Sequence, residues 1–214
     1  MSLSRRSVLV GLALAVGGCV TQRQPTMQTA ANAYVPDPYY VAMYGPVTTE
    51  PWPIAGVDLS KVDPRLLRQE VDYATYERPG TIVVDPGRRF LYLVREGGKA
   101  MRYGVGVGRP GFEWAGAHKV TRKAEWPGWT PPPQMRQRQP DLPAHMEGGP
   151  NNPLGAGALY HYRGGRDTKY RLHGTNRPVS IGQAMSSGCI RMLNTDVEHL
   201  YARTNVGTPV VVLA

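Results

Sequence analysis

Short runs of β-branched and aromatic residues, separated by glycine and proline turns, fill the sequence from residue 81 onward and limit the fold more than any other feature. The first two runs, at 81–85 and 90–94, flank the turn Pro86-Gly87-Arg88-Arg89 and predict a hairpin. A third run, at 101–108, contains spaced glycines, but no Gly-Lys-Ser/Thr with a following helix, so it does not predict a phosphate loop. We expect instead a strand that bends or lets another backbone approach closely.

Two more strands are predicted at 158–162 and 170–173, on either side of the turn Gly164-Gly165, and a last one at 210–213. The one clear helix is predicted within 194–201, where Thr195 and Glu198 have capping-box spacing and apolar residues recur at helical intervals. Many strands with one clear helix predict a mostly-β fold.

Residues 19–78 lack this patterning. Prolines interrupt any periodicity between residues 36 and 53, and tyrosine, threonine and glutamine are frequent. Such a composition predicts an extended linker. A short helix packed on the domain is predicted within it at 64–71, with Asp63 as the N-cap.

The first 18 residues have the order of a secretory signal peptide: basic Arg5-Arg6, an apolar run at 8–16, and small residues before Cys19. The apolar run is shorter than the roughly 20 residues that span a bilayer, so we expect export. Residues 14–19 (LAVGGC) resemble a bacterial lipobox, in which Cys19 is acylated and holds the protein at a membrane. The alternative is a chance cysteine in a signal that is discarded.

Cys189 is the only other cysteine, so it is predicted to be a free thiol once Cys19 is acylated or removed. Its neighbours in the segment 186–192 (SSGCIRM) are mostly small or polar, unlike a buried structural segment. The thiolate is the reactive form, and a free thiol with a pKa of about 8.5 is only a few per cent ionised at neutral pH. A neighbouring histidine removes this limitation, so we expect a cysteine nucleophile with a histidine base.

His173 is the favoured base, because it ends a predicted strand directly before a glycine, where a side chain can face a groove as the chain turns away. The spacing of residues in the sequence does not by itself exclude the other four histidines as the base. His161 lies in a predicted strand, His199 lies on the predicted helix, and His118 and His145 lie in predicted loops.

The formal net charge of +9 suits an anionic partner such as lipid, nucleic acid or an acidic polymer. Export and the lack of a compact Lys/Arg run argue against nucleic acid. No cofactor is predicted. A zinc site needs three or four ligands, so His173 and Cys189 alone do not predict a metal.

The segments 173–176 (HGTN) and 186–192 (SSGCIRM) resemble the catalytic signature of the L,D-transpeptidase catalytic domain (YkuD) family. The resemblance extends from about residue 81 to 213. It implies a β-sandwich-like domain, mostly β, with one C-terminal helix near the site. The loop at 126–133 is similar to that of the periplasmic branch of the family; its residues themselves leave two interpretations, a wall beside a substrate groove or a surface loop packed on itself.

The chain is thus expected to have three parts: a signal peptide at 1–18 with the lipobox cysteine Cys19, a Pro/Tyr-rich linker at 19–78, and an L,D-transpeptidase catalytic domain at 79–214.

The resemblance implies that Cys189 is the nucleophile and His173 the base. Gly174 stands where the family places a residue whose backbone carbonyl orients the histidine. The N–H groups of Gly188 and Cys189 are implied to form an oxyanion hole. Arg191 is implied to bind a substrate carboxylate with its planar guanidinium, with a structural salt bridge as the alternative.

Ser187 and Asn176 lie in these two segments, and Tyr170 lies in the predicted strand that ends at His173; all three are expected to contact substrate. Many family members have histidine directly before the Gly-Cys pair, where this chain has Ser187. The resemblance places the base at His173, so we expect Ser187 to be tolerated and to affect substrate positioning or the local pKa.

The implied activity is a cysteine L,D-transpeptidase of peptidoglycan. The thiol attacks the diaminopimelate–D-Ala bond of a stem tetrapeptide and passes the acyl group to an amine of another stem or of an envelope protein. Within the same chemistry, water as acceptor gives a carboxypeptidase or endopeptidase. A non-catalytic wall-binding lipoprotein is the alternative from another class, and a sortase-like transpeptidase fits the Ser-Gly-Cys segment less well. We expect the protein in the periplasm or cell envelope, anchored through Cys19.

Overall fold

The computed structural model describes residues 36–48, 51–110, 114–163 and 166–214. The predicted signal peptide, the lipobox cysteine and the first part of the predicted linker lie outside the described residues. In the described ranges, no helix is long and apolar enough to cross a membrane.

The largest sheet has six strands in the order β1-β4-β3-β2-β12-β6. Their bounds are β1 (Gln69–Asp72), β2 (Ile82–Asp85), β3 (Phe90–Val94), β4 (Lys99–Gly104), β6 (Gly116–Lys119) and β12 (Pro209–Val212). Neighbouring strands are antiparallel, except that β12 runs parallel to β2. The predicted hairpin is confirmed as β2 and β3, and the predicted C-terminal strand lies beside it as β12.

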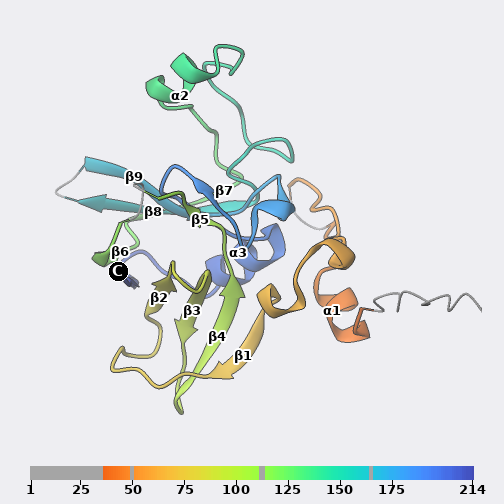
Figure 1. The fold of residues 1–214 in the computed structure, drawn as a ribbon, viewed down its shortest axis with the longest axis vertical. Coiled ribbons are helices and arrows are strands. Elements are labelled where there is room, and N and C mark those ends of the chain that lie inside the picture. The colour runs from red at the N-terminus through yellow and green to blue at the C-terminus, as the bar shows by residue number, and fades with distance from the viewer. Residues whose placement is uncertain (1–35, 49–50, 111–113, 164–165) are drawn as a thin grey trace, which may run out of the picture. The chain divides into compact units, whose positions relative to one another are not determined.

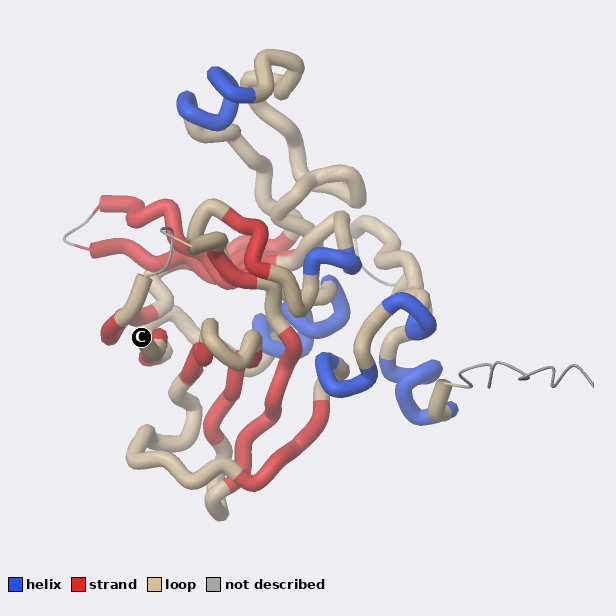
Figure 2. The backbone as a smooth tube through the Cα atoms, viewed as in Figure 1, coloured by secondary structure: helices blue, strands red, loops and turns tan. Residues whose placement is uncertain are grey.

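A second sheet has the order β11-β9-β8-β7. Its strands are β7 (Arg122–Glu125), β8 (Gly157–Arg163), β9 (Arg166–His173) and β11 (Ile190–Arg191), and two short parallel strands, β5 (Val107–Gly108) and β10 (Ala184–Ser186), pair separately. The predicted strand pair is confirmed as β8 and β9, which are antiparallel, whereas β11 runs parallel to β9. In Figures 1 and 2 this second sheet crosses above strands β1 to β4.

The helices are α1 (Pro38–Met43), α2 (Pro133–Arg138) and α3 (Asn194–Tyr201), with short 3₁₀ helices η1 (Leu59–Lys61), η2 (Pro64–Leu66) and η3 (Pro178–Ser180). The predicted C-terminal helix is confirmed as α3, but its predicted capping box does not form. The helix begins at Asn194, the N-cap position is Leu193, and no side chain caps it. Thr195, the predicted cap, is already inside the helix and buried.

The main core lies between the two larger sheets and α3. The six-stranded sheet contributes Ile82, Val84 and Leu91, the four-stranded sheet contributes Leu159, Leu172 and Ile190, and α3 contributes Val197 and Leu200. Burying one side chain of this kind stabilises a fold by about 1.5–3 kcal/mol. The sheets therefore face each other across a shared apolar layer, which is the mostly-β, sandwich-like arrangement that the sequence predicted.

The described residues between 36 and 72 pack against the domain, where the sequence predicted an extended linker. Tyr44 and Leu67 are buried in a second apolar cluster together with Ile181 and Leu193, which belong to the C-terminal part of the chain. The prolines do prevent long regular elements here, but isolated apolar side chains between them still reach the domain.

The helix predicted at 64–71 is shorter than expected. Only Pro64–Leu66 is helical, and the Asp63 side chain accepts the Arg65 N–H at 2.9 Å, so the predicted N-cap is confirmed. The chain then extends into β1, at the edge of the large sheet. A Cβ on Gly104 of β4 would lie 2.4 Å from the Leu66 carbonyl oxygen, so the close backbone approach expected in this glycine-containing strand is confirmed.

Candidate active site

Strands β9 and β11 bring together the two halves of the predicted signature. They pair in parallel, with Leu172 opposite Ile190 and His173 opposite Arg191. Leu172 and Ile190 are buried in the core. Because neighbouring residues of a strand point to opposite faces, His173 and Arg191 lie on the other face of the sheet. Cys189, directly before β11, lines the same groove as these two residues.

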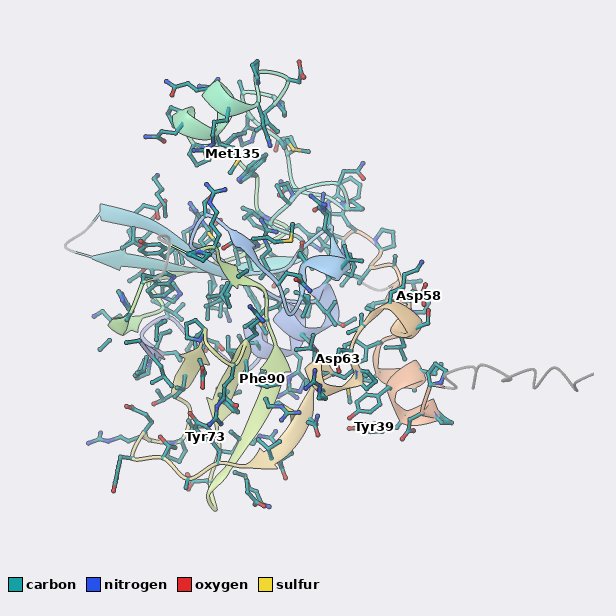
Figure 3. The ribbon with its side chains drawn as sticks, viewed as in Figure 1. Tyr39, Asp58, Asp63, Tyr73, Phe90 and Met135 are labelled. Carbon is teal, nitrogen blue, oxygen red and sulfur yellow. The ribbon has the colours of Figure 1, made fainter. Side chains whose placement is uncertain are left out.

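The groove has a volume of about 700 Å³, and the loop before α2 forms one wall of it. Trp129, the prolines at 131–133 and Met135 line it. Met135 is labelled in Figure 3, on α2, which stands above β9 in Figure 1. Trp129 lines the groove, as the first interpretation of this loop expects, whereas Trp126 is packed into the main core, which neither interpretation expects.

His173 is buried, with only 4% of its surface exposed, and its Nδ1 lies 2.6 Å from the Gly174 carbonyl oxygen. A carbonyl can only accept, so Nδ1 carries the proton and Nε2 keeps its lone pair. Burial, with the positive charges of Arg191 and Arg171, lowers the pKa of His173 to about 3. The imidazole is therefore neutral at neutral pH and can accept a proton at Nε2.

The turn that supplies this carbonyl is packed tightly against the start of α3. A Cβ on Gly174 would lie 2.3 Å from Asn194 Oδ1 and 3.1 Å from Val197 Cγ1, which explains the glycine. Asn194 Oδ1 accepts the N–H groups of Thr175 at 3.0 Å and Ala156 at 3.2 Å. The first residue of α3 thus holds the turn after His173, a role that the helix pattern alone did not reveal.

Cys189 is a half-buried free thiol, and its Sγ lies 3.3 Å from the Lys169 carbonyl oxygen. Burial raises the pKa of the Cys189 thiol, while the charge and hydrogen bonds of Arg171 and the charge of Arg191 act to lower it. The net direction is upward. The groove therefore holds a neutral thiol and a neutral imidazole, a pair in which thiolate forms when the imidazole takes the proton.

The loop before Cys189 is tied together by Ser186. Its Oγ accepts the Gly188 N–H at 3.1 Å and donates to the Cys189 carbonyl at 2.6 Å. Gly188 has φ 109°, a backbone conformation that residues other than glycine rarely adopt. Two N–H groups are expected in the oxyanion hole. The Gly188 N–H is directed at Ser186 Oγ, whereas the Cys189 N–H is part of the next peptide unit and is not bound by Ser186.

Arg171 is the groove residue that sequence analysis missed. Its guanidinium pairs with Asp167 at 3.0 Å and lies 5.0 Å from the centre of the Tyr160 ring. It lines the groove and is the charged side chain that most lowers the pKa of Cys189. A signal was present: Arg171 is two residues before His173, so a strand places both on one face.

Two of the predicted substrate contacts lie in the groove. Arg191 and Ser187 line it, and both also line a second groove next to it. Asn176 lines only the second groove, and its Nδ2 donates to the Asn151 carbonyl at 2.8 Å.

Tyr170 does not line either of these grooves. It neighbours Arg171 in β9, so strand alternation turns it to the opposite face. Its ring stacks on Trp114, with ring centres 4.7 Å apart and planes 11° apart. The expectation that Tyr170 contacts substrate is not supported by its position.

The other histidines do not line the groove. His118 and His161 belong to an aromatic cluster around Trp114, and His199 Nδ1 lies 2.8 Å from the Tyr103 hydroxyl. Among the residues with a described position, no group of three or more histidine, cysteine, aspartate or glutamate side chains could hold a metal ion.

Comparison with known proteins finds a single family over most of the chain. The family model "YkuD: L,D-transpeptidase catalytic domain" matches residues 79–212. The probable L,D-transpeptidase ErfK/SrfK of Escherichia coli (strain K12) is 35% identical over 144 residues, covering 64% of this chain and 44% of that protein. The chain therefore spans less than half the length of that relative.

The solved structures that are similar to the chain differ in how much of its sequence they share. One from Brucella melitensis, described as a probable carnitine operon oxidoreductase, is 46% identical and covers 73% of this chain and 99% of its own, with a TM-score of 0.49. The Ldtfm–avibactam carbamoyl enzyme covers 64% of this chain and 50% of its own, with a TM-score of 0.50 at 19% identity. The second likeness is one of fold.

Proposed function

Because the chain belongs to the L,D-transpeptidase catalytic domain (YkuD) family, a family of enzymes, we propose that it is a cysteine L,D-transpeptidase of peptidoglycan stem peptides. The observation that carries the proposal is a groove lined by both Cys189 and a buried, neutral His173 whose Nδ1 is fixed by the Gly174 carbonyl. A neutral imidazole whose Nε2 carries no proton is the form that removes a proton from a thiol.

The first half-reaction transfers the acyl group of a stem tetrapeptide to Cys189. His173 Nε2 takes the thiol proton as Sγ attacks the carbonyl carbon of the diaminopimelate–D-Ala bond. Negative charge then collects on the carbonyl oxygen, where the Cys189 N–H is the donor that stabilises it. As the tetrahedral intermediate collapses, the C–N bond breaks, the imidazolium gives its proton to the leaving amine of D-alanine, and a thioester remains.

The second half-reaction releases the acyl group. An acceptor amine attacks the thioester, His173 takes the amine proton, and Sγ leaves and is reprotonated. The amine belongs to another stem or to a lysine of an envelope protein. Water in the place of the amine makes the protein a carboxypeptidase, or an endopeptidase on existing cross-links.

The charge of the groove supports an anionic peptide substrate. Arg122, Lys169, Arg171 and Arg191 all line it. Stem peptides carry several carboxylates, and guanidinium groups bind carboxylates through paired N–H donors. Asp167 also lines the groove, but it is held by Arg171 at 3.0 Å.

The decisive test is mass spectrometry of residues 20–214, without the predicted signal peptide and lipobox cysteine, incubated with disaccharide-tetrapeptide. We expect loss of D-alanine together with a cross-linked dimer in the wild type, and a loss of at least about 10³-fold in rate for Cys189→Ala and for His173→Ala. Tripeptide without dimer would indicate the carboxypeptidase or an absent protein acceptor. A wild type that behaves like Cys189→Ala would contradict the proposal and favour a wall-binding protein without activity.

We also propose that residues 1–18 are a signal peptide and that acylated Cys19 anchors the domain at 79–214 in the periplasm or cell envelope. The support is the order of basic, apolar and small residues before Cys19. Fractionation of cells should find the Cys19→Ser variant in the soluble fraction and Cys189→Ser, the matched control, with the membranes. Retention of Cys19→Ser on membranes would count against the anchor.

A further inference from the structure

Behind the cysteine loop, on the side away from the groove, lies an aromatic cluster built around Trp114. The Trp114 indole N–H donates to the Gly188 carbonyl at 2.7 Å. The indole is itself held by stacking on Tyr170 and by an edge-on contact with His118, each with ring centres 4.7 Å apart. A ring fixed on two sides gives its single donor a fixed direction.

The hydrogen bond has a consequence for the other end of the same peptide. The Gly188 carbonyl and the Cys189 N–H belong to one peptide unit, and no cis peptide is found among the described residues. In a planar trans peptide the C=O and N–H point in opposite directions. Holding the Gly188 oxygen toward Trp114 therefore directs the Cys189 N–H away from Trp114.

Trp114 and the groove lie on opposite faces of β9, because Trp114 stacks on Tyr170, whereas the next residue of the strand, Arg171, lines the groove. Trp114 lines a different cavity, with Val107, Gly108 and Ala184, and it does not line the groove that contains Cys189. The side of the Gly188–Cys189 peptide that faces away from Trp114 is therefore the side on which the groove lies. The preceding N–H, on Gly188, is already directed at Ser186, so the Cys189 N–H is the loop donor that a substrate carbonyl can use.

We propose that Trp114 is a positioning residue for acylation: its indole N–H holds the Gly188 carbonyl so that the Cys189 N–H is aimed at the oxygen of the carbonyl under attack. This proposal rests on the proposed function. Ser186 binds the Gly188 N–H and the Cys189 carbonyl, which belong to the peptides on either side, so the indole N–H is the contact that holds the Gly188–Cys189 peptide itself.

Two reactions of the same thiol separate this role from simple packing. Acylation by a carbapenem, a β-lactam, builds negative charge on a carbonyl oxygen and needs the donor. Alkylation by iodoacetamide displaces iodide at a methylene carbon and forms no oxyanion. Trp114→Phe removes the donor and keeps a smaller aromatic ring for the stack. We expect acylation, followed by intact mass, to slow by about 10- to 100-fold, because loss of an oxyanion donor costs about 10²–10³ and here the donor is misdirected, not removed. Alkylation should stay within about twofold of the wild type.

A second variant sets hydrogen bonding against packing. Trp114→His has a smaller ring but keeps a ring N–H, so positioning predicts faster acylation, relative to alkylation, in Trp114→His than in Trp114→Phe. A packing role predicts the reverse order, and that result would overturn the proposal. So would equal slowing of both reactions in Trp114→Phe. Trp52→Phe is the matched control, since Trp52 is 46% exposed and does not line the groove. A wild type that is alkylated but neither acylated nor active on tetrapeptide would remove the proposed function itself, and this proposal with it.

Discussion

At the scale of single residues, the positive charge beside the thiol comes from Arg171 and Arg191 and not from the neutral histidine. Arg171 pairs with Asp167 at 3.0 Å and acts to lower the pKa of Cys189 against the effect of burial. Arg171→Gln removes that charge, so the pKa of the thiol should rise further. Each unit of pKa changes the thiolate fraction tenfold below the midpoint, so we expect alkylation by iodoacetamide at pH 7 to slow by about 3- to 10-fold. A pH–rate profile measures the shift.

Arg122→Gln is the matched control for this experiment. Arg122 lines the same groove and lies 4.7 Å from the centre of the Tyr160 ring, but it is not among the main groups that shift the pKa of Cys189. Its pH–rate profile should follow that of the wild type. If the profile of Arg171→Gln does so too, the guanidinium has no effect on the thiol.

The candidate nucleophile and base could be proposed from sequence because their signals are local: a thiol among small residues, and a histidine before a glycine. The spacing of Arg171 from His173 predicts only that both lie on one face of a strand, which a solvated arginine also fits; the pairing of β9 with β11 is what puts Arg171 beside the thiol. Trp114 is 74 residues from Gly188, so no local pattern connects them.

At the scale of elements, the segment from α1 to β1 is held to the domain by one buried polar cluster. The Tyr44 hydroxyl donates to the carboxylate of Asp196 in α3, at 3.0 and 3.2 Å, and accepts the Arg68 N–H at 2.6 Å. Tyr44→Phe leaves these groups buried without that partner, which typically costs about 1–3 kcal/mol. Urea unfolding should show a decrease of that size in the free energy of unfolding. The same change at Tyr39, which is 63% exposed, should have almost no effect. Equal stability of the two variants would show that the Tyr44 hydroxyl does not hold the segment.

Some of these elements could be predicted from the sequence and others could not, depending on whether their signals are local. Strands β2, β3, β8 and β9 have β-branched or aromatic runs bounded by turns, and these signals do not depend on distant parts of the chain. The apolar residues of 36–72 have no period, because prolines separate them. Their burial depends on Ile181 and Leu193, more than a hundred residues further along the chain.

At the scale of the whole molecule, we expect stability to fall in mild acid. Burial lowers the pKa of His161 to about 4, and those of His173 and His199 to about 3. Histidines in the unfolded chain titrate near about 6.5. As the pH falls from there toward about 4, the unfolded chain binds protons that the folded protein does not, so the free energy of unfolding decreases. Burial raises the pKa of Asp196 from 3.8 to about 7, which stabilises the folded protein as the pH falls through that range, but one carboxyl does not outweigh three histidines. Urea unfolding across this pH range measures the decline.

His199→Gln removes one of the three histidines, so the free energy of unfolding should decrease less steeply with falling pH. A decrease as steep as that of the wild type would contradict the assignment of His199.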